Sequence, residues 1–234
     1  NKLSYYFRER ILSFKEAKAL QELELTILAQ LSGYENFSLP DTLKTFHITF
    51  KCRYFRGHNP LEGFPGRLIN EIKHLSQLKT LYWVETLQGS AYSEPIILEL
   101  TKILPASLST LALQASFEQT DNQQRADLVR NIANLPTLKT LSIATIDYHR
   151  TDIIIEKGLN TLECFVSRRC KILKLKDINQ FLNPNKLEMF VMKSQFFQEM
   201  AEREFARFLN NLRRFQCLYH LEISSIYITD ISDD

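Results

Sequence analysis

Histidine and cysteine are the residue types with which this sequence could bind a metal ion or attack a substrate. The five histidines show no HExxH motif or comparable metal-ligand spacing: His47, His58, His74, His149 and His220. The four cysteines form no CxxC pair: Cys52, Cys164, Cys170 and Cys217. Scattered cysteines favour a reducing, intracellular compartment over an oxidising one. We therefore expect neither a metal nor a cofactor.

A catalytic thiol would need a cysteine that a nearby base can deprotonate. Cys164 occupies a position from which an alternating strand would point its side chain inward, so we expect it to be a small core residue. No other residue pattern suggests a catalytic group. We expect that the chain is not an enzyme.

The segment 57–66 contains half of the six glycines and follows the aromatic and basic residues 53–56. Its glycine order, without a following Lys-Ser/Thr, does not match a phosphate-binding loop. It either joins two structural units or contacts a partner, because loops on rigid scaffolds often carry recognition.

A basic run lies further along the chain: Arg168, Arg169, Lys171, Lys174 and Lys176. It is either a solvated surface or a contact for an acidic partner or a phosphate group. No aromatic residues are interleaved for base stacking, so we expect no nucleic-acid binding.

The overall composition agrees with a globular chain. The 29 basic and 27 acidic residues leave a net charge of +2, too even for a dedicated nucleic-acid or membrane-surface protein. No apolar stretch approaches the roughly 18 residues that a membrane helix needs, so we expect no membrane insertion. Because the chain begins at Asn1, we interpret it as a trimmed fragment.

A repeated phrase, L-x-x-L/F-x-L, determines where the strands are expected. It recurs at intervals of about 21 to 35 residues, as internal repeats of a solenoid would. Its apolar positions are Leu20-Leu23-Leu25, Leu43-Phe46-Ile48, Leu78-Leu81-Trp83, Leu108-Leu111-Leu113, Leu138-Leu141-Ile143, Leu159-Leu162-Cys164, Leu187-Phe190-Met192 and Leu218-Leu221-Ile223. The last two positions alternate as in a half-buried strand.

Between the phrases the apolar spacing changes to that of amphipathic helices. Leu68, Ile72 and Leu75 are spaced four and three, and so are Leu128, Ile132 and Leu135. A third stripe runs through Ala201, Phe205, Phe208 and Leu212. Ser93, and Asp121 followed by Gln124, are expected helix starts. A doubly wound sheet would show the same alternation, but it does not require one Leu phrase in every strand.

With these phrases the chain resembles the leucine-rich-repeat family, and its long units resemble the ribonuclease-inhibitor type. The resemblance implies an α/β solenoid, a curved horseshoe with parallel strands on the concave face and helices mostly on the convex face. It covers residues 20–224 in about eight irregular units, with 1–19 as a helical flank or cap and 225–234 as a tail or further repeat. The family's asparagine after the strand is absent. The repeats also resemble, more loosely, those of effectors that intracellular bacteria such as Legionella deliver into host cells, which would place the chain in the host cytoplasm.

Threonine occupies the third position of five consecutive phrases: Thr45, Thr80, Thr110, Thr140 and Thr161. We expect a ladder on the exposed strand face. Its members either suit a pleated strand as β-branched residues or contact a ligand.

Family members act mainly by binding other proteins, so the resemblance implies a protein-protein interaction module. By register, Trp83 points into the core while Tyr82, Val84 and Glu85 point outward. Partner contacts are expected on the concave face at His47, Thr49, Tyr82, Val84, Glu85, Gln114, Glu163, Phe165, Lys193 and Glu222. The alternative is the substrate-recognition or regulatory part of a larger enzyme, such as a ubiquitin ligase, with its catalytic or adaptor domain outside these residues.

Overall fold

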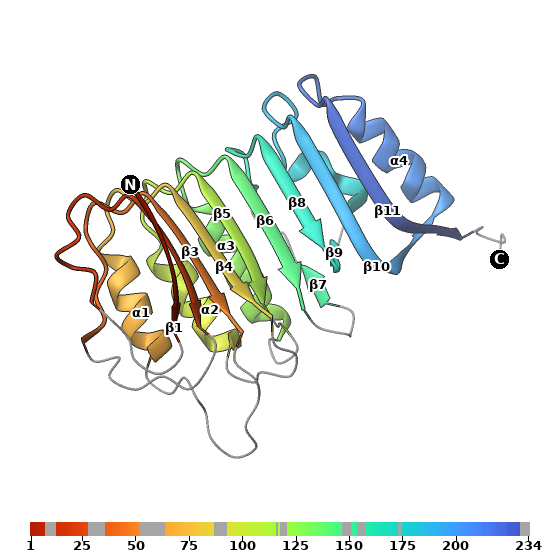
Figure 1. Ribbon diagram of the computed structural model, residues 1–234. Coiled ribbons are helices and arrows are strands. Elements are labelled where there is room, and N and C mark those ends of the chain that lie inside the picture. Colours follow the sequence, from red (N-terminus) through yellow and green to blue (C-terminus); the bar gives the residue numbers. More distant parts are fainter. Residues whose placement is uncertain are drawn as a thin grey trace, which may run out of the picture.

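The chain forms an open parallel sheet with helices on one side, as a computed structural model shows (Figure 1). The structure describes residues 1–7, 13–27, 36–51, 64–86, 93–115, 117, 121–146, 151–153, 158–172 and 175–229. The main sheet has nine strands, in the order β1 (Lys2–Phe7), β2 (Glu22–Ile27), β3 (Thr45–Phe50), β4 (Thr80–Glu85), β5 (Thr110–Ala115), β6 (Thr140–Thr145), β8 (Cys164–Arg168), β10 (Met189–Ala201) and β11 (His220–Thr229). Each described pair of neighbours is parallel.

Seven of the eight sequence phrases supply the strands β2 to β6, β10 and β11, and the sixth phrase lies just before β8 and overlaps its first residue. The ninth strand, β1, lies where we expected a helical flank, so that expectation is wrong for residues 2–7. Leu3 of β1 pairs in register with Leu23, as a further unit of the sheet would. At the other end, β11 continues as strand to Thr229, beyond the boundary expected at residue 224.

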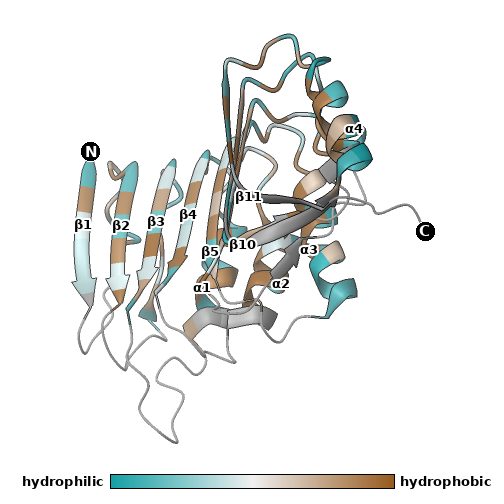
Figure 2. Cartoon of the chain, turned by 90° about the vertical axis from the view of Figure 1, so that its right-hand side faces the viewer, coloured by the Kyte–Doolittle hydropathy of each residue, from teal (hydrophilic) through white to brown (hydrophobic). Residues whose placement is uncertain are grey.

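The helices connect successive strands. They are α1 (Phe64–Lys73), α2 (Ser93–Ile103), α3 (Asn122–Ala133) and α4 (Glu202–Leu212), together with the 3₁₀ helix η2 (Leu175–Gln180). A small second sheet pairs β7 (Thr151–Ile153) with β9 (Cys170–Ile172). Figure 2 shows that α1 to α4 lie on the same side of the main sheet. The α/β class and the alternation of strand and helix are thus confirmed.

The start of α3 has the side-chain capping that the sequence predicts. The Gln124 backbone N–H donates to the Asp121 carboxylate over 2.7 Å, and the Asp121 backbone N–H donates to the Gln124 side chain over 2.9 Å. This capping box satisfies amide groups that lack partners within the first turn. The apolar stripes also behave as expected, since Leu68, Ile72 and Phe208 are buried.

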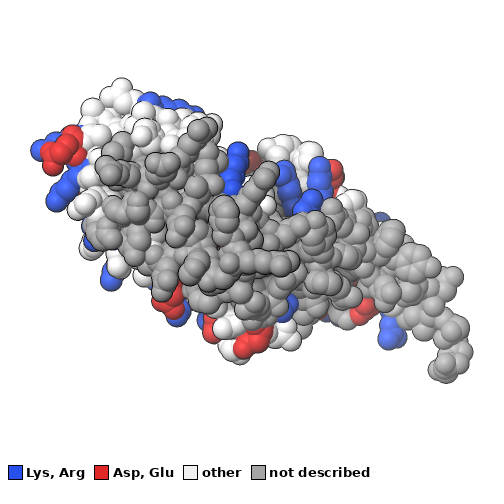
Figure 3. Space-filling model, turned by 60° about the horizontal axis from the view of Figure 1, so that its bottom comes forward, with Lys and Arg blue, Asp and Glu red and all other residues white. Residues whose placement is uncertain are grey.

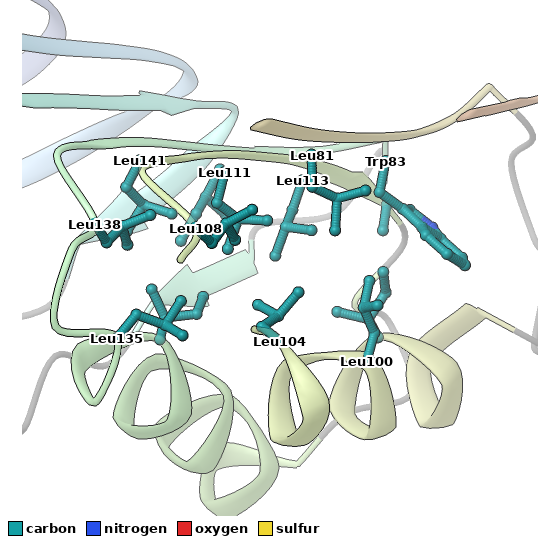
Figure 4. Close-up of a cluster of buried hydrophobic side chains, with 14 of the residues drawn as sticks. Leu81, Trp83, Leu100, Leu104, Leu108, Leu111, Leu113, Leu135, Leu138 and Leu141 are labelled. Atoms are coloured by element: carbon teal, nitrogen blue, oxygen red, sulfur yellow. The ribbon is translucent and has the colours of Figure 1, made fainter. Parts of the chain in front are cut away.

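The core lies between the sheet and the helices. Leucines from β4, β5 and β6 point toward Leu100 of α2, toward Leu104 directly after α2, and toward Leu135 after α3 (Figure 4). Two parallel rows supply the strand side of this core, because register partners stack along the sheet. They are Leu23, Phe46, Leu81, Leu111, Leu141, Phe165, Phe190 and Leu221, and Leu25, Ile48, Trp83, Leu113, Ile143, Ser167, Met192 and Ile223. At the β11 end of the two rows, Leu221 is 47% exposed and Ile223 is half-buried.

The sixth phrase was assigned in the wrong register. Phe165 pairs with Leu141 and Phe190, so it belongs to the first core row, and its ring stacks on that of Phe190 with centroids 5.8 Å apart. Cys164 pairs with Thr140 and therefore faces the opposite side of the sheet. The true phrase is Leu162-Phe165-Ser167. Ser167, a polar residue at its last position, made the apolar Leu159-Leu162-Cys164 a better match to the pattern.

Candidate protein-binding face

The sheet face opposite the helices, here called the open face, presents three rows of side chains. Register partners define them as Thr45, Thr80, Thr110, Thr140, Cys164 and Met189; as Glu24, His47, Tyr82, Ala112, Ser142, Val166, Val191 and Glu222; and as Thr26, Thr49, Val84, Gln114, Ala144, Arg168, Lys193 and Ser224. Because strand side chains alternate, these rows are the counterparts of the core rows. The open face carries six of the ten expected contact residues in accessible positions.

An aromatic cluster lies toward the β1 end of the open face. The rings of His47 and Tyr82 are neighbours across β3 and β4, with centroids 5.4 Å apart. Thr49 Oγ1 lies 3.3 Å from His47 Nε2, within hydrogen-bonding distance. Tyr82 is 38% exposed. A ring held by its neighbours but still exposed loses little conformational freedom on binding, as favourable contact residues require.

Small side chains occupy the middle of the open face. Ala112 and Ser142 are half-buried, and Ala144 is buried. Gln114 is the largest side chain here, and its amide donates to the Glu85 carbonyl over 3.2 Å. This stretch provides a smooth surface with few groups that could bind strongly.

Charged side chains lie toward the β11 end. Lys193 forms an ion pair with Glu222, with 2.7 Å between Nζ and Oε1. Arg168 is exposed and occupies the register position beside Lys193. Figure 3 shows another aspect of the molecule, on whose described part basic and acidic side chains are interspersed. On the open face, the Lys193–Glu222 ion pair joins the neighbouring strands β10 and β11.

Four of the ten expected contact residues are not available in the way we expected. Glu85 is two residues after Trp83 on β4, so it shares the core-facing side of the strand, where it is buried. Phe165 is also buried in the core, and it was expected on the outer face only because the sixth phrase was assigned in the wrong register. Thr49 faces the open side but is only 8% exposed, since its neighbours cover it. Glu163 precedes β8 and pairs with Lys139 over 2.8 Å. The hydrogen bond from the Lys139 ammonium to the Glu163 carboxylate, together with the negative charge of Glu163, raises the pKa of Lys139.

On β8, the sequence pattern did not identify three open-face residues, Cys164, Val166 and Arg168. The signal that could have located them is the string Leu162 to Ser167, which matches the phrase once its last position is allowed to be polar. Four of the five expected threonines form the ladder, and Cys164 takes the place assigned to Thr161.

Cys164 is therefore not a core residue, which corrects the expectation from its strand position. Its thiol is half-buried and lies 3.6 Å from the sulfur of Met189. Burial raises the pKa of the Cys164 thiol, which disfavours the thiolate that a nucleophile would need. Within the described ranges, no disulfide joins Cys164, Cys170 or Cys217.

Part of the sequence-based expectation falls outside the described residues. Of the segment 57–66, only the last three residues are described, and they begin α1. In the basic run, Arg168 and Arg169 are exposed, while the side chains of Lys171, Lys174 and Lys176 are outside the description. Cys52, His58 and His149 also lie outside it.

No group of three or more His, Cys, Asp or Glu residues within the described ranges is arranged to hold a metal ion. None of the helices found there is both long enough and apolar enough to cross a membrane. Comparison of the chain with models of known protein families and with curated proteins finds no match.

Proposed function

We propose that this chain is a non-enzymatic protein-binding module, built as a leucine-rich-repeat solenoid, that contacts its partner through the open face. The observation that carries the proposal is the face of the parallel sheet opposite the described helices, which presents an aromatic cluster and a charged cluster from strands of one sheet. The regular Leu and Phe phrase, with one strand per repeat, supports the solenoid.

The aromatic cluster and the charged cluster would contribute to partner binding in different ways. Tyr82 and His47 offer aromatic area of the kind that forms the centre of protein interfaces. Arg168, Lys193 and Glu222 offer charges that orient a partner and increase its association rate. The smooth middle between them would add shape complementarity without strong contacts of its own.

Site-specific crosslinking tests this proposal. A photoreactive phenylalanine analogue at Tyr82 on the open face should form an adduct with the partner protein in cells. The same analogue at Lys73, which is exposed on α1 at the helix side, is the matched control. Adducts of one defined protein at position 82 but not at position 73 are expected.

The identified partner then allows a quantitative test. The double variant His47→Ala and Tyr82→Ala should weaken its binding at least about tenfold, as loss of central aromatic contacts does. Lys73→Ala should leave the affinity unchanged. Adducts at position 73 alone, or full affinity in the double variant, would contradict binding through the open face.

A further inference from the structure

A pocket lined by arginines lies between η2 and α4, in the helix layer of the molecule and away from the open face. Its volume is about 600 Å³. Three arginines and several amide side chains line it, among them Arg203, Arg207, Arg214, Asn179, Gln180 and Asn210. The lining is thus rich in hydrogen-bond donors and contains no carboxylate.

The arginines share this pocket because of helix geometry. Arg203 and Arg207 are four residues apart on α4 and therefore project on one side of the helix, and Arg214 lines the same pocket from the turn that follows the C-cap Arg213. The opposite side of α4 carries Phe208 and Leu212, which are buried in the core. At about 1.5 Å per residue, α4 rises roughly 14 Å from Arg203 to its last residue, and Arg214 lies beyond that end.

Among the described residues, an ion pair neutralises one of these three positive charges. Arg207 Nη2 lies 2.5 Å from Asp177 Oδ1, and that carboxylate comes from η2. Within the described part of the chain, Arg203 and Arg214 form no ion pair. Glu202 and Glu204 lie in the first turn of α4, but neither lines the pocket. The pocket therefore has an uncompensated arginine toward each of its ends.

We propose that this pocket binds a small ligand that carries two or more phosphate groups. A phosphate bears more charge than a carboxylate and accepts paired hydrogen bonds from the planar arginine fork. Arg203 lies in the first turn of α4 and Arg214 beyond its C-terminal end, so a ligand with two linked phosphates can place one phosphate at each arginine. The amides of Asn179, Gln180 and Asn210 supply further donors.

The lining also argues against a nucleic acid as the ligand. None of the residues that line the pocket is aromatic, so no side chain there can stack on a base. Recognition would rest on the phosphate groups alone. Inorganic tripolyphosphate is therefore a suitable probe, because it presents linked phosphates without a base or sugar.

Calorimetric titration of the chain with tripolyphosphate tests the proposal. The double variant Arg203→Ala and Arg214→Ala should lose at least about tenfold in affinity. The control is the double variant Arg213→Ala and Lys73→Ala, which removes the same charge from exposed positions outside the pocket. It should bind like the original chain. Arg207 is left intact, because the Asp177 side chain is only 15% exposed and would lose its partner.

Three outcomes would overturn the proposal. The original chain does not bind tripolyphosphate, or the control variant loses as much affinity as the pocket variant, or citrate binds as tightly as tripolyphosphate. Thermal melts show whether each variant folds. If the Arg203→Ala and Arg214→Ala variant does not fold, the double variant Arg203→Gln and Arg214→Gln repeats the test. Tyr82→Ala, on the open face, should leave tripolyphosphate binding unchanged, so this result is independent of the proposed protein contact.

Discussion

The indole N–H of Trp83 donates a hydrogen bond to the carboxylate of Glu85, with 2.8 Å between Nε1 and Oε1. The two residues are two positions apart on β4 and thus share one face of the strand. Trp83 is 1% exposed and Glu85 is 6% exposed. A residue that its charge would assign to the surface is therefore part of the interior, where buried polar groups must be hydrogen-bonded.

We expect Glu85→Ala to lower the free energy of unfolding by about 1–3 kcal/mol, because the buried indole N–H loses its acceptor. Glu85→Gln should cost less, since the amide oxygen can still accept this hydrogen bond. Glu99→Ala on α2, whose ion pair with Lys102 is exposed, should change stability by less than about 0.5 kcal/mol. Urea denaturation of the three variants makes the comparison. A neutral Glu85→Ala variant would contradict the role of Glu85 in the core.

The register of β8 predicts a contrast between adjacent residues. Phe165→Ala should destabilise the chain by roughly 3–5 kcal/mol, because it leaves a cavity beside Phe190 in the first core row. Val166→Ala, on the open face, should cost about 1 kcal/mol or less. Chemical denaturation measures both values. If Val166→Ala proved the more damaging change, the face assignment of β8 would have to be reversed.

Ser167 offers a stabilising substitution. It is 1% exposed in the second core row, and within the described structure its hydroxyl has no hydrogen-bond partner. Ser167→Ala should raise the free energy of unfolding by about 1 kcal/mol, because it removes a buried polar group that is not satisfied. Ser142→Ala, at a half-buried open-face position, is the matched control and should have little effect. A loss of stability in Ser167→Ala would show that the hydroxyl is bonded.

The cysteines should react with iodoacetamide in a fixed order, which peptide mass spectrometry can follow in a Cys52→Ser background. Cys217 is exposed and should be alkylated first. Cys164 should follow, because burial raises the pKa of its thiol and so reduces its thiolate fraction near pH 8. Raising the pH should therefore accelerate its labelling. Cys170, which is buried, should react last. Labelling of Cys164 ahead of Cys217 would contradict this assignment.

Local sequence determined most of the secondary structure. The Leu and Phe phrase placed seven strands, and the four-and-three spacing placed α1, α3 and α4, because each pattern reflects burial of one face of a local element. The capping box at Asp121 is equally local, since its two hydrogen bonds join residues three apart. In β4 the alternation alone assigned Tyr82 and Trp83 to opposite faces.

Tertiary structure decided the points at which a residue's type disagrees with its surroundings. Strand β1 has no complete phrase, and its identity depends on pairing with β2. Glu85 and Ser167 are polar side chains in core rows, and Phe165 was assigned outward, since pairing with neighbouring strands, and not hydropathy, sets the face of each residue. The arginine pocket likewise requires η2 to pack against α4, and no local pattern indicates that contact between segments apart in the chain.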